Sequence, residues 1–307
     1  MKTFYDAEQY CCGIFDSLWP FWHLWTPEDA PVVFRNEQDF MDGMGIVGIC
    51  AKLTPEIKVL TFQLMSNHVH FTLSGPEAEA KSFYETLIAL LSNWLKSRKR
   101  TVSLDTWTPS LRRIETMSDL RNVIAYNNRN GFLVHPEHTP FSYPWGANRY
   151  YFNPEAKLRF SQNADKTLMT VRTKRDLVRS HIADGVAGPA MSDGYACPLD
   201  YCDIELGEKL FRNATHYLNH ITRNVESQKT IAAEIGERIF YTDEELFNVV
   251  CTLSKQASGQ FSPATLPKEM KTSIAKTLHF EYNAGNKQIA RMLRMDLGVV
   301  NAMFPKQ

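Results

Sequence analysis

The stretch Leu64–Gly75, "LMSNHVHFTLSG", decides how the chain around it folds. Its histidines alternate with apolar residues, and successive side chains of a β-strand point to opposite faces. His68, His70 and Thr72 would therefore share one face of a strand. The other face would suit a protein core, because it carries Val69, Phe71 and Leu73. Two imidazoles on one strand face stand roughly 6–7 Å apart at their backbones, close enough to bind one metal ion.

The segments on either side of this strand extend the pattern. Residues 56–65, "EIKVLTFQLM", alternate well enough for a second strand, and a short polar turn joins it to the first as an antiparallel hairpin. Residues 21–26 and 30–34 also read as extended. Helical periodicity predicts helices at residues 36–52, opening at Asn36, at 77–99, and at 117–130, where Thr116 and Asp119 are placed like a capping box. This order predicts an α+β fold, an antiparallel sheet with helices on one face.

The helix predicted at residues 117–130 carries candidate chemistry. Tyr126 and Asn130 are spaced i and i+4, so a phenol and an amide emerge together from one flank of this helix. A tyrosine can attack phosphorus and form a covalent phosphotyrosine while a divalent metal ion polarises the phosphate. The alternative interpretation is that Tyr126 is an ordinary half-buried aromatic residue at a helix edge.

Three segments together resemble a known family. The segment "LMSNHVHFTL" resembles the "PNHVHLLL" strand of the HUH-class single-tyrosine transposases, and "AYNNRNGF" resembles the "YIHxNPV" helix of their REP-associated branch. The segment "PFSYPWGANRYY", residues 140–151, resembles the "W-S-S…Y" ending of that branch. The segments occur in the family's order, and the resemblance covers about residues 15–152.

The resemblance implies a function and a site. His68 and His70 would be metal ligands, Asn130 a third ligand and Tyr126 the nucleophile. The family's ferredoxin-like sheet, its Mg²⁺ or Mn²⁺ ion and its cleavage of single-stranded DNA near a hairpin are then expected. The product would be a 5′-phosphotyrosine link and a free 3′-OH, which allows strand transfer, transposition and DNA recombination. The chain would be a tyrosine-type DNA transposase or endonuclease.

The sequence departs from the family at three positions, and other functions stay open. Ser66 stands in place of a proline, Asn128 in place of a histidine and Gly131 in place of a second proline. Loss of the imidazole could remove a proton-handling or metal-binding group, so the chain could be a catalytically inactive DNA-binding regulator. A two-histidine phosphoesterase would use His70 and Thr72, but the only other His-x-Thr, at residues 220–222, falls in a helical pattern.

Charge gives a weaker indication of DNA binding. The formal net charge is zero, so no global field attracts a polyanion, and only local basic patches count. The run "VRTKRDLVR" at residues 171–179 is one such patch. The clearest patch is "KSRKR", whose candidate DNA-binding residues are Lys96, Arg98, Lys99 and Arg100. Each run could equally be a solvated helix face.

The chain is expected to form a transposase-like domain at residues 1–155, a connector at 156–205 and an all-α domain at 206–307. Residues 268–304 have the spacing of a helix-turn-helix, with Asn286 and Asp296 as N-caps. Arg294 occupies the turn position where glycine is usual, and Asn301 is the candidate for base contact. Further upstream, "HYLNH" places two histidines, 216 and 220, at helical i and i+4. They are a possible metal pair, although a packing role is favoured.

The remaining features concern the compartment of the protein. Six cysteines follow no disulfide or zinc-site spacing, which indicates reduced thiols. The N-terminus lacks a basic start and an apolar core, and no window approaches the ~20 apolar residues of a membrane span. We therefore expect a cytoplasmic protein that binds single-stranded or hairpin DNA and no membrane. A homodimer is left open.

Overall fold

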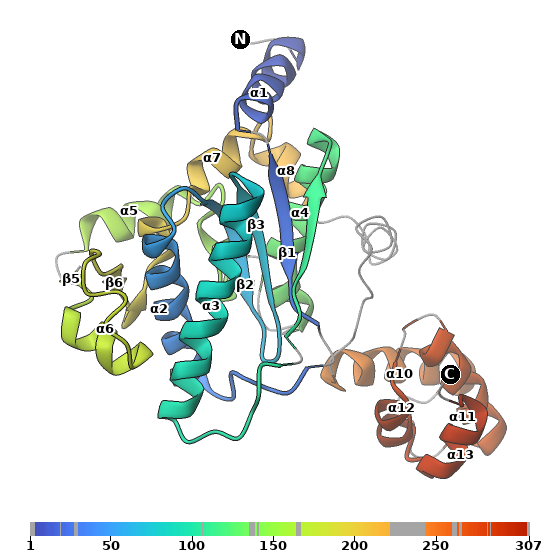
Figure 1. The fold of residues 1–307 in the computed structure, drawn as a ribbon. Coiled ribbons are helices and arrows are strands. Elements are labelled where there is room, and N and C mark those ends of the chain that lie inside the picture. Colours follow the sequence, from blue (N-terminus) through green and yellow to red (C-terminus); the bar gives the residue numbers. More distant parts are fainter. Residues whose placement is uncertain are drawn as a thin grey trace. The chain divides into compact units, whose positions relative to one another are not determined.

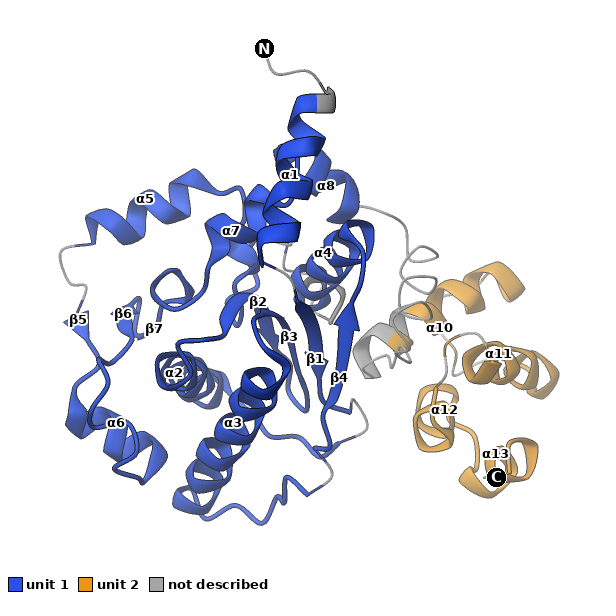
Figure 2. Ribbon diagram, turned by 45° about the horizontal axis from the view of Figure 1, so that its top comes forward, with its two compact units in different colours: residues 1–132, 137–231 blue, residues 133–136, 232–307 orange. Residues whose placement is uncertain are grey.

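The computed structural model describes residues 4–18, 20–27, 30–105, 107–134, 139, 141–163, 167–221, 243–259, 263, 266–280, 282 and 284–305. It divides into two compact units, and each is described by itself (Figure 2). The first unit comprises residues 1–132 and 137–231, and the second comprises residues 133–136 and 232–307. The protein is α+β. None of the described helices is long and apolar enough to cross a membrane.

A four-stranded sheet organises the first unit (Figure 1). Its strands lie in the order β2-β3-β1-β4, and every neighbouring pair is antiparallel. Helix α2 connects β1 to β2, and helix α3 connects β3 to β4. The bounds are β1 Phe21–Trp25, α2 Glu37–Leu53, β2 Lys58–Leu64, β3 Val69–Ser74, α3 Glu77–Ser97 and β4 Ser110–Ile114. Strands β1, β2 and β3 and both helices occupy segments predicted from the sequence, whereas β4 was not predicted and residues 30–34 form no strand.

Helices α2 and α3 cover the apolar face of the sheet. The ring centroid of Phe71 on β3 lies 5.6 Å from that of Phe62 on β2 and 5.2 Å from that of Phe83 on α3. All three rings are fully buried. On α2, Gly43 permits close approach, because a Cβ there would stand 2.7 Å from the Phe34 ring and 2.9 Å from Leu64. This face is the hydrophobic core of the unit.

Helix α4, Met117–Val134, covers the opposite face, so the expectation of helices on one face only is wrong. The Asn127 amide on α4 donates to Oγ1 of Thr72 on β3 at 2.9 Å, and Thr61 on β2 donates to Asn128. The alternating polar residues of the strands look from the sequence like a solvent face. They are buried instead, because α4 supplies amide groups that hydrogen-bond to them.

The segment that resembles the family's "W-S-S…Y" ending lies along the outer edge of β2. The backbone N–H of Leu64 donates to the Trp145 carbonyl at 2.9 Å, and the N–H of Ala147 donates to the Phe62 carbonyl at 3.1 Å. The Tyr143 hydroxyl donates to the Leu64 carbonyl at 2.7 Å. This pairing satisfies backbone groups that an edge strand otherwise exposes.

The expected domain boundary at residue 155 and the separate connector at 156–205 are wrong. Residues 156–205 pack into the first unit: the Asp203 N–H donates to the Val59 carbonyl at 2.8 Å, and Lys52 lies 3.1 Å from the Asp200 carboxylate. The change in sequence pattern after residue 155 therefore does not mark the end of the unit, which continues with a small three-stranded sheet of order β5-β6-β7. The other elements are α1 Phe4–Leu18, α5 Pro154–Gln162, β5 Thr167–Leu168, α6 Val171–Val178, β6 Ala190–Ser192, β7 Tyr195–Ala196, α7 Ile204–Lys209 and α8 Ala214–Ile221, with 3₁₀ turns at Asn148–Tyr150 and Pro198–Asp200.

Helices make up the described elements of the second unit: α10 Asp243–Ser258, α11 Lys268–Phe280, α12 Asn286–Leu293 and α13 Leu297–Met303. The turn between α12 and α13 contains Arg294 in the left-handed region, at φ +50°. Asp296 caps α13 as expected, since its carboxylate accepts from the Gly298 and Val299 N–H groups. Asn286 is not the N-cap of α12, because Gly285 takes that position and Asn286 is already helical. The core comprises Leu246, Val250, Ile274, Leu278, Ile289, Leu293, Val300 and Phe304.

Candidate active site

The structure brings the two histidines of the opening stretch together. His70 lies on β3 and His68 lies just before it, and their ring centroids are 4.9 Å apart with the rings nearly perpendicular. Only 8% of His68 and none of His70 is exposed. Nδ1 of His68 is 2.9 Å from Oδ1 of Asn67, so the preceding residue fixes the orientation of this ring.

Tyr126 on α4 joins this pair from the opposite layer. Its ring centroid lies 5.6 Å from that of His70, with the two rings at 87°, and the residue is only 3% exposed. Asn130 lies one helical turn further along α4 and is also buried. No hydrogen bond between its amide and either histidine is found among the described residues. The structure therefore places the Tyr126 ring against the His70 ring, whereas the Asn130 side chain, one turn further along α4, makes no described hydrogen bond to either histidine.

His23 is a site residue that the sequence interpretation missed. It lies on β1, fully buried, with its ring stacked on that of His70 at 5.8 Å and edge-on to Tyr126 at 6.2 Å. The Trp25 ring also stacks on His23, with the ring centroids 4.5 Å apart. The register explains the cluster, because His23 pairs with Thr72 on β3 and so shares the face of His70. Alternation between Trp22 and Leu24 was the available signal, but it gains meaning only once this pairing is known.

Burial keeps these imidazoles neutral. Burial lowers the pKa of His23 to about 3, and the Arg112 guanidinium adds to this effect while the nearby Asn127 amide opposes it. Burial also lowers the pKa of His68 to about 3. The pKa of His70 falls well below its ordinary value because of burial and the proximity of the other two rings. At neutral pH each ring therefore keeps a nitrogen lone pair, the form that binds metal ions or accepts a proton.

The donor set fits one half of a metal centre. Two adjacent neutral imidazoles, His68 and His70, suit a divalent transition-metal ion better than Mg²⁺, which prefers oxygen ligands. No group of three or more His, Cys, Asp or Glu side chains in the described part of the chain is placed to hold a metal ion. The remaining ligands would have to be the Asn130 amide, water or a substrate phosphate.

Asn128, which stands where the family has a histidine, anchors α4 to the rest of the unit. Its Oδ1 accepts from the Thr61 hydroxyl, and its Nδ2 donates to the Tyr217 hydroxyl at 2.9 Å. Asn128 is completely buried. Both ends of this amide are therefore used to hold α4 against Thr61 of β2 and Tyr217 of α8. The departure from the family pattern therefore has a structural role.

Gly131, which stands where the family has proline, has a similar explanation. Its N–H donates to Oε1 of Gln63 at 2.7 Å, and a proline has no N–H to donate. A Cβ at this position would stand 2.2 Å from the Tyr143 ring. The close approach of α4 to Tyr143 therefore requires glycine, and Gly131 helps to hold Tyr126 over the sheet.

Arg129 places a buried positive charge near Tyr126. Arg129, three residues after Tyr126 on α4, is 4% exposed. Burial lowers the pKa of its guanidinium, while the nearby Tyr126 phenol acts in the opposite direction. The site thus combines neutral imidazoles, a phenol and a guanidinium, and the guanidinium can bind an anion.

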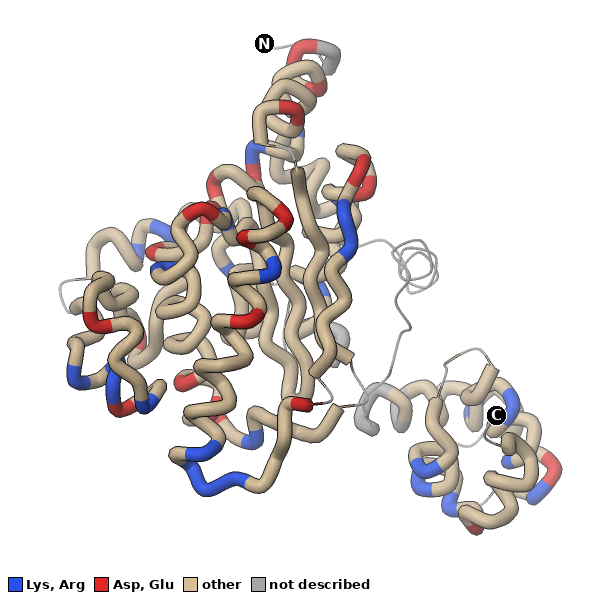
Figure 3. The backbone as a smooth tube through the Cα atoms, viewed as in Figure 1, with Lys and Arg blue, Asp and Glu red and all other residues tan. Residues whose placement is uncertain are grey.

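The predicted basic patch is only partly available for DNA. Figure 3 shows basic positions gathered at the end of α3. Lys96 and Lys99 are exposed. Arg98 pairs with Asp42. Arg100 pairs with Asp39, donates to the Val33 carbonyl at 2.6 Å and lies 5.0 Å over the Trp94 ring, so its role is structural.

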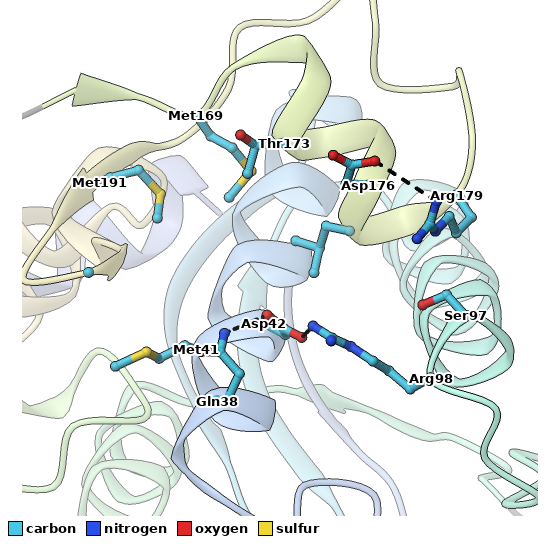
Figure 4. Close-up of a pocket in the computed structure, with 12 residues that line it drawn as sticks. Gln38, Met41, Asp42, Ser97, Arg98, Met169, Thr173, Asp176, Arg179 and Met191 are labelled. Carbon is cyan, nitrogen blue, oxygen red and sulfur yellow. Dashed lines mark hydrogen bonds and ion pairs between the residues drawn. The ribbon is translucent and has the colours of Figure 1, made fainter.

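A pocket of about 370 Å³ lies between α2, α6 and the end of α3, where the two basic runs meet (Figure 4). Its charged lining consists of two opposite pairs: Arg98 with Asp42, and Arg179 with Asp176 at 3.9 Å. The pairs cancel, so the pocket offers no net charge to a polyanion.

Two remaining predictions fall elsewhere. Asn301 is exposed on α13, and its Oδ1 accepts from the Asn286 amide at 3.0 Å. For the phosphoesterase interpretation, His220 lies in α8 and Thr222 lies outside the described residues, so a second His-x-Thr strand is not described. Comparisons of the chain with protein-family models, with curated proteins and with solved structures find no match.

Proposed function

We propose that this chain is a metal-dependent nuclease of the HUH single-tyrosine transposase type, acting on single-stranded or hairpin DNA. The observation that carries the proposal is the convergence of His68, His70 and Tyr126 from separate elements into one buried cluster. Nothing in sequence spacing forces a strand pair and a helical tyrosine 56 residues later to meet, so their contact supports a shared role. His23 and Arg129 extend the same cluster.

The proposed reaction is an attack of the Tyr126 phenol oxygen on a DNA phosphorus. The Oη–P bond forms and the P–O3′ bond breaks, which leaves a 5′-phosphotyrosine and a 3′-OH that takes up a proton. The phenol proton leaves to solvent water, and the neutral rings of His23 and His70 line the site beside Tyr126. Arg129 supplies positive charge for the phenolate and the phosphate. His68 and His70 would hold a Mn²⁺ or Mg²⁺ ion, which would supply Lewis-acid polarisation of the phosphate.

Two finer features of the fold belong to the same proposal. The order β1-α2-β2-β3-α3-β4 and the sheet order β4-β1-β3-β2 support a ferredoxin-like assignment. The pair α12 and α13, joined by a short turn through Arg294, supports a helix-turn-helix in an all-α second unit.

A second candidate function is the DNA-binding regulator that has lost catalysis. The specific observation in its favour is that Tyr126 is 3% exposed, so a phosphate reaches it only if neighbouring side chains move. Asn128 also stands where the family has a histidine, so the family's imidazole is absent from the site, and the Asn128 amide instead hydrogen-bonds to Thr61 and Tyr217.

One experiment separates the two candidates. The full chain is incubated with labelled single-stranded hairpin DNA and Mn²⁺, and a covalent adduct is scored on denaturing gels. The nuclease proposal expects an adduct with the natural protein, none with Tyr126→Phe, and nearly equal DNA binding by both. An adduct retained by Tyr126→Phe contradicts the proposal. Binding of hairpin DNA by the natural protein without any cleavage establishes the regulator instead.

A further inference from the structure

A second histidine pair lies on helix α8, away from the strand pair in sequence. His216 and His220 are one helical turn apart, with Nε2 of one 3.3 Å from Nε2 of the other. Their ring centroids are 4.9 Å apart at 77°, close to the separation found for His68 and His70. His220 is 9% exposed, whereas His216 is half-buried, so one side of the pair is open to solvent.

The hydrogen bonds around His220 fix its tautomer. Its Nδ1 lies 3.2 Å from Oδ1 of Asn122 on α4. An amide oxygen can only accept, so Nδ1 of His220 carries the proton, and its Nε2 keeps a lone pair directed at His216. Histidine ligands of metal ions almost always donate their other N–H to such an oxygen. His220 therefore stands in the protonation state and orientation of a metal ligand.

The distance between the two nitrogens suits a chelated ion. Zn–N bonds of about 2.0–2.1 Å at a tetrahedral angle place two ligand nitrogens about 3.3–3.4 Å apart. The observed separation is 3.3 Å. The two nitrogens therefore already stand at the separation that a tetrahedral ion requires, and each ring has only to turn its lone pair toward the ion.

We propose that His216 and His220 form a two-imidazole binding site for a borderline-soft divalent cation such as Zn²⁺. On binding, the His216 proton moves to Nδ1, which gives up the long 3.3 Å contact from the Arg212 N–H. The ion would then bridge two successive turns of α8, and the existing His220–Asn122 hydrogen bond connects this part of α8 to α4. This site is separate from the strand pair and does not depend on the proposed nuclease function.

The surroundings limit the affinity of this site. Glu8 is near His216, but its carboxylate is held by Arg121 at 2.6 Å and faces Arg212 at 3.7 Å. No third His, Cys, Asp or Glu completes the site among residues that the structure describes. Water or a small anion must therefore fill the other coordination positions. We expect a site that binds Zn²⁺ reversibly.

The test is titration of the chelator-treated full chain with ZnCl₂ by isothermal calorimetry, with thermal unfolding measured in parallel. His216→Gln should lose one binding event or weaken it at least tenfold, and Zn²⁺ should raise its Tm less than that of the natural protein. The matched control is His181→Gln, because His181 is exposed beside Asp184 and far from the pair in the chain. This control should bind as the natural protein does.

His70→Gln separates this site from the strand pair. It should keep the event assigned to His216 and His220, whatever happens to DNA cleavage. Natural affinity and stoichiometry in His216→Gln overturn the proposal. If His220→Gln does not fold, the half-buried His216 variant still decides the question.

Discussion

The two faces of the central sheet are built from the same four strands and differ in almost every other respect. One face carries Phe62 and Phe71 against α3, and its contacts are non-directional packing. The other carries His23, His70 and Thr72 against the amides of α4, and its contacts are directional. The apolar face explains why the unit folds. The polar face costs stability, because it buries imidazoles that water would solvate, so its composition is better explained by chemistry than by folding.

The largest expected effect on the free energy of unfolding comes from a substitution in the apolar face. Phe71→Ala removes a fully buried ring between Phe62 and Phe83 and leaves a cavity. The free energy of unfolding should fall by about 3–5 kcal/mol, measured by urea denaturation. Leu168→Ala is the matched control, because Leu168 is 60% exposed and should cost almost nothing. A loss below about 1 kcal/mol for Phe71→Ala contradicts the assignment of this face as the core.

The next effect tests the buried imidazoles of the polar face through pH. The pKa of His23 is about 3 when folded and about 6.5 when unfolded, so the unfolded chain binds more protons below neutral pH. The contribution of the neutral His23 ring to the free energy of unfolding is therefore fully present above about pH 6.5 and is lost as the pH falls toward 3. Between pH 7 and pH 5 the loss should be about 2 kcal/mol for this residue, from urea melts of metal-free protein. His23→Gln should flatten the dependence by this amount, and an unchanged slope contradicts the burial of a neutral ring.

A smaller effect tests how the polar face holds α4. Asn128→Ala leaves the Thr61 and Tyr217 hydroxyls without this amide in a buried setting. The free energy of unfolding should fall by about 1–3 kcal/mol. Asn127→Ala is the comparison, since it removes the one hydrogen bond to Thr72 and should cost less. Equal and negligible losses in both variants contradict the view that α4 is docked by its amides.

The smallest expected effect on stability is at Asn130. Asn130→Ala should change the free energy of unfolding by about 0.5 kcal/mol or less, because no hydrogen bond between its amide and either histidine is found in the part of the chain that the structure describes. If Asn130 is the third ligand, Mn²⁺ affinity in calorimetric titration should fall at least tenfold. Unchanged Mn²⁺ affinity removes Asn130 from the site and leaves water or phosphate in its place.

Much of the fold could be predicted from the sequence where alternation and helical periodicity are strong. The strands at Phe21–Trp25 and Val69–Ser74 and the helices around them follow from local pattern alone. Strand β4, "SLRRI", escaped prediction because Arg112 and Arg113 look unsuited to a sheet. Arg112 is tolerated because it pairs with Asp119 of α4 at 2.6 Å, a contact between segments that local pattern does not reveal.

The candidate site divides in the same way. The candidate roles of His68, His70 and Tyr126 could be predicted from the sequence, because each residue stands in a local motif. His23 was not, since its place beside His70 depends on the register of β1 against β3. The second layer over the polar face was missed for a related reason: buried polar residues and solvated ones look alike until their partners are known. The amides of Asn127 and Asn128 are those partners.

The most direct test of the account is mass spectrometry of the DNA adduct formed by the natural protein with hairpin DNA and Mn²⁺. The proposed tyrosine nuclease should carry a nucleotide mass on the peptide that contains Tyr126, on the polar face of the sheet. A nucleotide on a different tyrosine, such as Tyr143, contradicts it. So does complete absence of an adduct under conditions where the protein binds the DNA.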